Sequence, residues 1–176
     1  LAQIVDPAAA AAAHKAGVGA TVTVGLGGGL DRGRFSPMAV TARVKLLSDG
    51  QGRLETMKAG LDAGPTAVLV FDNFTVVVFS KTLSLFDRAM YYANGLNPTD
   101  FDLIVVKSPH TEYHMYEQWA EKNFNVDVAG STSANLVTGD TNGQSDVFLF
   151  NRNTQATTRL SVNAADSQNN HLFRSI

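Results

Sequence analysis

Two histidines four residues apart come nearest to metal chemistry in this sequence. His110 and His114 flank Glu112 in the stretch HTEYH. On an α-helix, residues four apart share a face and can bind one metal ion together. Zinc-peptidase helices place a glutamate directly after the first histidine or directly before the second, and Glu112 occupies neither place. Three interpretations stay open: a plain helix start, which we prefer, a substrate contact, or a metal site.

A second candidate is the pair Lys107 and Ser108, which follows a predicted strand and opens a predicted helix. Open α/β folds present side chains and helix N–H groups to ligands at this position, so an anionic or carbonyl group could be held there. A helix cap beside a surface lysine is the simpler alternative. Asp87, directly after Phe86, is a loop carboxylate that could face a partner domain or solvent.

We therefore name five candidate substrate or interface residues and predict neither a catalytic residue nor a metal ligand. The five are Lys107, Ser108, His110, His114 and Asp87.

The composition excludes several classes of protein. The 176 residues carry a net charge of −2, and their basic side chains are scattered along the sequence. The sequence therefore offers no basic cluster that would bind the phosphates of a nucleic acid. There is no cysteine, so disulfides, thiolate catalysis and sulfur-ligated zinc are excluded. The longest apolar stretch, the alanines of 8–13, is too short for a membrane span. We expect no nucleic-acid partner, no membrane partner and a cytoplasmic location.

The elements that would position these residues begin with a helix. Asp6 suits its N-cap, Pro7 its first turn and Gly17 its end. Alternating β-branched residues predict strands over 20–24, 38–47, 66–71 and 74–79. Asp72-Asn73 suits the tight turn between the last two strands. The first half therefore predicts a largely antiparallel β unit.

The second half predicts a different arrangement. A short helix is expected over 87–93. After it, a strand over 101–106, a helix to about Lys122 and a strand over 125–128 would form a βαβ unit. Beyond Gly139, alternating strands over 145–150 and 157–162 predict one hairpin. The predicted fold class is mixed α/β: an antiparallel β unit, then a βαβ unit, then a C-terminal β-hairpin tail.

Several stretches together resemble the C-terminal domain of the microcystinase C (MlrC) type of metallopeptidase. They follow one another in order over residues 1–136: DPAAA at 6–10, GVGA at 17–20, LGG at 26–28, LSDG at 47–50, GPTAVL at 64–69, FD at 86–87, VVKS at 105–108, VD at 126–127 and GST at 130–132. The tail instead resembles part of a secreted bacterial β-propeller repeat, which cannot bury its faces alone. We predict domains over 1–138 and 139–176.

The resemblance implies a fragment of a longer metal-dependent peptidase. An N-terminal catalytic domain would supply the zinc ligands, and this chain would complete the cleft for a short or modified peptide without binding metal or acting alone. Relatives place a histidine where this chain has Thr111, beside His110. The alternative is a non-enzymatic binding or scaffold module, and an exposed patch of Phe71, Phe74 and Phe79 would fit either function.

Overall fold

The computed structural model describes residues 1–29, 33, 35–83, 85–107, 113–124, 148–151 and 156–159. The chain divides into two compact units, Leu1–Asn123 and Phe124–Ile176. In the second unit, β8 (Phe148–Asn151) pairs antiparallel with β9 (Ala156–Arg159), which confirms the predicted hairpin. The predicted domain boundary after residue 138 stays a prediction.

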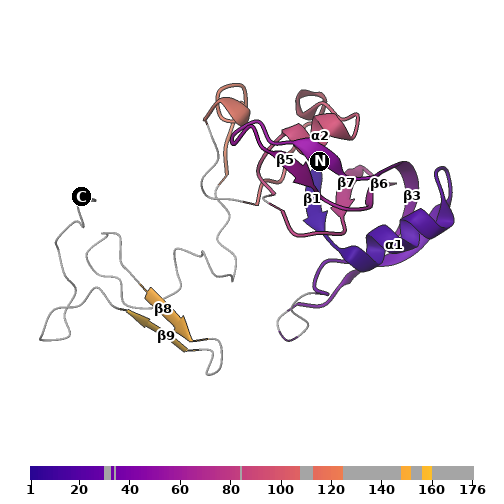
Figure 1. Ribbon diagram of the computed structural model, residues 1–176, viewed down its shortest axis with the longest axis horizontal. Helices are drawn as coiled ribbons and strands as arrows, with labels where there is room; N and C mark the ends of the chain where they lie inside the picture. Colours follow the sequence, from indigo (N-terminus) through magenta and orange to yellow (C-terminus); the bar gives the residue numbers. More distant parts are fainter. Residues whose placement is uncertain are drawn as a thin grey trace, which may run out of the picture. The chain divides into compact units, whose positions relative to one another are not determined.

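The first unit is built on a five-stranded sheet with helix α1 (Pro7–Ala16) lying across it (Figure 1). The strand order is β1 (Ala2–Val5), β7 (Phe74–Phe79), β6 (Thr66–Phe71), β3 (Met38–Ser48) and β2 (Thr21–Leu26). Neighbours are antiparallel except β1, which runs parallel to β7. A smaller hairpin joins β4 (Gln51–Arg53) to β5 (Gly60–Asp62).

Three short helical segments complete the described part of this unit. They are α2 (Ala89–Ala93) and the 3₁₀ turns η1 (Pro98–Asp100) and η2 (Tyr113–Met115). Among the described residues, no helix has the length and apolar character needed to cross a membrane.

The mixed α/β class, helix α1 and the largely antiparallel first half are confirmed. Asp72 turns the β6–β7 hairpin with φ of 47°. Strand β1 was not predicted, because four residues at the start of the sequence carry too little alternation to identify a strand. The glycines after β2 form a turn, in which Gly27 and Gly28 adopt φ of 69° and 68°.

The predicted strand over 101–106 is wrong. That run forms one isolated bridge to the sheet, where Val105 pairs with Ala2 and donates its N–H to the Leu1 carbonyl at 2.9 Å. The Leu1 amino group in turn donates to the Leu103 carbonyl at 2.8 Å. Leu103 and Val105 are 62% and 56% exposed, so the apolar run is not the buried strand that its composition indicates.

The predicted helix through Lys122 is also wrong over its described part. The backbone makes the η2 turn and then further turns because other groups take its carbonyls. Arg88 donates to the His114 carbonyl at 3.1 Å, and the Trp119 indole donates to the Met115 carbonyl at 2.9 Å. An α-helix would give those carbonyls to N–H groups four residues on. The last strand of the predicted βαβ unit lies outside the described residues.

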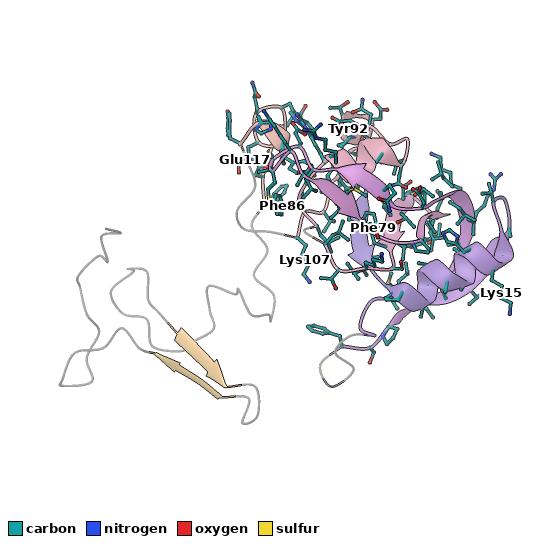
Figure 2. All side chains as sticks on the ribbon, viewed as in Figure 1. Lys15, Phe79, Phe86, Tyr92, Lys107 and Glu117 are labelled. Carbon is teal, nitrogen blue, oxygen red and sulfur yellow. The ribbon has the colours of Figure 1, made fainter. Side chains whose placement is uncertain are left out.

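Two hydrophobic cores flank the sheet. Ala9, Ala10 and Ala13 of α1 are fully buried against one face, where their small side chains let the helix axis approach closely. On the other face, Phe79 packs with Met90 and Tyr91 of α2. Figure 2 shows Phe79 within the crowded interior and Lys15 projecting from the end of α1.

Asp6 ties the helix to the sheet. It is 7% exposed; one carboxylate oxygen accepts the Ala9 N–H at 3.0 Å as an N-cap, and the other accepts the Gly27 N–H at 2.9 Å. The second bond links the start of α1 to the turn that follows β2.

Replacing Asp6 tests this tie. Asp6→Ala should lower the free energy of unfolding by about 2 kcal/mol, since it removes a helix cap and leaves a second N–H without its acceptor. Asp6→Asn should cost less, because asparagine caps helices well. Urea denaturation measures both, with Asp102→Ala at an exposed position as the control. Equal losses in Asp6→Ala and Asp102→Ala would contradict the assignment.

Candidate functional site

Asp87 is the most buried acidic side chain of the described residues and holds two loops together. Its carboxylate is fully buried. One oxygen accepts the Ala89 N–H at 2.8 Å at the start of α2. The other accepts the N–H groups of Glu55 and Thr56 at 2.9 and 3.1 Å and the Thr56 hydroxyl at 3.3 Å. Backbone donors thus replace the water that a carboxylate needs.

The neighbouring Arg88 extends this cluster outward. Its guanidinium holds Glu55 through two bonds of 2.8 and 2.7 Å, a bidentate geometry that is strong and directional. Nε2 of His114 lies 3.1 Å from the same Glu55 carboxylate. The hydrogen bond from Arg88 holds the pKa of Glu55 below its ordinary value and raises the pKa of Arg88 itself. Glu55, Arg88 and His114 therefore form a half-buried ion-pair cluster next to Asp87.

Two aromatic residues pack beneath the cluster. Burial raises the pKa of Tyr91 and Tyr116 above the ordinary phenol value. The Tyr116 hydroxyl and the Gln3 carbonyl oxygen are buried without a protein hydrogen-bond partner. The Gln3 amide donates to the Asp87 backbone carbonyl at 3.2 Å, which links β1 to the cluster.

These residues do not fit a metal ion. Both Glu55 oxygens accept from Arg88, and a cation placed there would sit against the guanidinium charge. Nε2 of His114 is engaged with Glu55, and the Asp87 oxygens are taken by backbone donors. Across the described ranges, no group of three or more His, Cys, Asp or Glu could hold a metal.

The structure places three of the five predicted site residues. Asp87 is fully buried rather than facing solvent, and its role as a substrate or interface residue stays a prediction. His114 is half-exposed and reaches Glu55. Lys107 is exposed at the edge of the drawn side chains (Figure 2), and its N–H donates to the Leu85 carbonyl at 3.2 Å. Ser108 and His110 lie outside the described residues.

Both ends of the segment 107–114 are therefore anchored on one short stretch. Lys107 is bonded to Leu85, and the His114 carbonyl is bonded to Arg88. Residues 85–88, which we call the clamp, therefore form hydrogen bonds with both Lys107 and His114. The sequence argument missed Arg88 and Glu55. Only Arg88 adjoins Asp87 in the sequence, whereas Glu55 lies 33 residues before Arg88, so no local pattern pairs the two charges.

The predicted aromatic patch is only partly right. Phe79 is fully buried, because it points to the second core. Phe74 is 55% exposed and stacks on Phe71 with ring centroids 5.5 Å apart. These two rings line a groove of about 550 Å³ on the α1 side of the sheet, together with Ile4 and Met38.

Comparisons with known proteins point to one family. The model of the family described as "MlrC C-terminus" matches residues 1–141. A crystal structure from Mesorhizobium sp. BNC1, described as a "putative metallopeptidase", is similar with a TM-score of 0.56 and 26% identity. The similarity covers 65% of this chain and 24% of that one, so this chain corresponds to about a quarter of the longer protein. No curated protein matches.

Removing the Asp87 carboxylate should destabilise the first unit strongly. Asp87→Ala leaves the N–H groups of Glu55, Thr56 and Ala89 without their acceptor, and we expect a loss of about 3 kcal/mol. Chemical denaturation measures this. Asp62→Asn, which alters an exposed pair with Lys81, is the control and should cause a clearly smaller change. A loss in Asp87→Ala no greater than that of the control would contradict the assignment.

The ion pair of Glu55 with Arg88 should make the free energy of unfolding depend on pH in the acidic range. The folded state lowers the pKa of Glu55, so its contribution is complete above the ordinary value of 4.5 and is lost as the pH falls through the folded-state pKa. The difference in unfolding free energy between wild type and Glu55→Gln should therefore shrink as the pH falls below 4.5. Urea melts from pH 7 downward measure it, and a constant difference would contradict the pairing.

Proposed function

This chain belongs to the MlrC C-terminus family, and on that premise we propose that it is the C-terminal accessory domain of a metal-dependent peptidase. The family match over residues 1–141 carries the proposal. The similarity to a quarter of a chain described as a metallopeptidase supports it. In this proposal an N-terminal catalytic domain binds the zinc and this chain completes the cleft for a short or modified peptide.

Lys107 is the side chain best suited to face that substrate. It is exposed, and its backbone is fixed to Leu85 of the clamp. A lysine ammonium is a compact charge that suits a carboxylate or a carbonyl oxygen of a peptide. Ser108 and His110, which follow it in the sequence, are proposed to contact the substrate with it.

The cluster of Asp87, Arg88, Glu55 and His114 has a supporting role in this proposal. It anchors the far end of the segment that begins at Lys107. Its acidic oxygens are occupied by protein donors, so the metal ligands are assigned to the catalytic domain. A bound metal there would polarise the scissile amide carbonyl and activate water.

The first test compares the isolated chain with the longer polypeptide that its reading frame encodes. We expect the isolated chain to bind no stoichiometric zinc and to hydrolyse no member of a short-peptide panel, and the longer polypeptide to do both. Zinc bound by the isolated chain and lost on replacing His110 and His114 would overturn the proposal. A reading frame with nothing upstream would favour the scaffold module instead.

Lys107 is tested in the longer polypeptide. Lys107→Ala should lower kcat/KM by about tenfold or more, the scale expected when one charged substrate contact is lost. The control is Lys81→Ala, another exposed lysine, which should leave kcat/KM unchanged. Steady-state kinetics on the same peptide measure both, and equal values for the two variants would remove Lys107 from the proposed cleft.

A further inference from the structure

The sheet carries an apolar groove that helix α1 does not cover. Strand β3 pairs with β6 only from Arg43 onward, whereas its pairing with β2 continues to Met38. The β2–β3 arm, residues 22–26 and 38–42, therefore extends past the end of β6. The Gly27 N–H reaches the Asp6 carboxylate at 2.9 Å, which ties the end of the arm to the far edge of the sheet. The groove lies beside this arm, on the face of the sheet against which α1 packs.

The groove has a buried floor and an exposed apolar rim. Leu26, Val40 and Val76 are buried in its floor. Met38 and Phe74 on the rim are 57% and 55% exposed. On the opposite face, the second core covers β6 and β7, whereas Thr23 and Thr41 of the β2–β3 arm are exposed. Large apolar side chains gathered at a concave site are typical of a binding surface.

We propose that this groove is the docking site for the domain that precedes this chain in the longer polypeptide. The inference rests on the proposed function. The similar metallopeptidase chain is about four times as long as the region matched here, so most of such a protein lies outside this unit. The partner's docking element would place aliphatic or aromatic side chains in the groove. A basic residue would meet Asp72, which is exposed on the rim.

The size of the groove favours an attached partner over a free one. Ten residues line it, whereas a stable complex of separate proteins uses roughly 20–30 residues on each side. A covalently attached domain needs less contact, because the connection holds it at an effective concentration on the order of millimolar. A second copy of this chain would lack that advantage.

The four methionines differ in exposure, so their oxidation rates can report which surface a partner covers. Met38 lies on the groove rim and Met57, 60% exposed, lies on the β4–β5 turn, while Met90 and Met115 are fully buried. In the isolated chain, dilute peroxide should oxidise Met38 and Met57 at similar rates. In the longer polypeptide, the rate at Met38 relative to Met57 should fall by about tenfold or more, since oxidation follows exposure. Peptide mass spectrometry measures each site.

A pair of variants tests the same surface independently. In the longer polypeptide, Met38→Asp should weaken docking and increase limited proteolysis between the domains, whereas Met57→Asp should not. Both positions are exposed, so the isolated chains should melt alike. Equal oxidation of Met38 and Met57 in the longer polypeptide, or equal proteolysis of the two variants, would overturn the inference. So would protection of Met38 in the isolated chain that grows with concentration, since a second copy would then be the occupant.

The outcomes separate the two proposals. If the longer polypeptide hydrolyses peptide and loses activity without this chain, yet Met38 stays as reactive as Met57, the accessory role stands and the groove assignment fails. If Met38 is protected but removing this chain leaves peptidase activity intact, the docking site stands and the accessory role fails.

Discussion

The middle of the β6–β7 hairpin is buried on both faces of the sheet. Val68 and Val77 point into the second core, Leu69 and Val78 into the first, and all four are completely buried. Both cores therefore depend on the same two strands, and a one-residue slip would exchange every side chain between the two faces. The register is set by the tight turn at Asp72 and by apolar residues on both faces, which is why this segment reads as a continuous β-branched run.

Beyond β7, hydrogen bonds from side chains satisfy the backbone groups that neighbouring strands satisfy within the sheet. Asp87 collects N–H groups from two loops, and Arg88 takes carbonyls that a helix would otherwise use. Such a region gains its order from a few charged groups rather than from local propensity. The hydrogen bond from the Lys107 N–H to the Leu85 carbonyl holds Lys107 at a defined place beside this region.

This contrast explains what the sequence could and could not predict. The first half carries local signals: the Asp6 cap, the β-branched strands and the Asp72 turn all act within a few residues, and each was identified correctly. In the second half, the apolar run over 101–106 resembled a buried strand, but it makes only an isolated bridge to β1 and leaves Leu103 exposed. Of the site, Asp87 and His114 were found by residue type. Glu55 was not, because only the fold brings it to them.

The groove results from two features that a chain selected only for stability could have avoided. Helix α1 stops at Gly17 after ten residues, and the rim carries Met38 and Phe74 where polar residues would serve. The same strand shows that such residues are available, since β3 exposes Arg43 and Lys45 where it faces water. Along β3 from Val40 to Lys45, buried apolar side chains alternate with exposed polar ones, so the exposed Met38 departs from the pattern of its own strand. That selective placement is what an interface requires, because burial against a partner turns the cost of exposure into binding free energy.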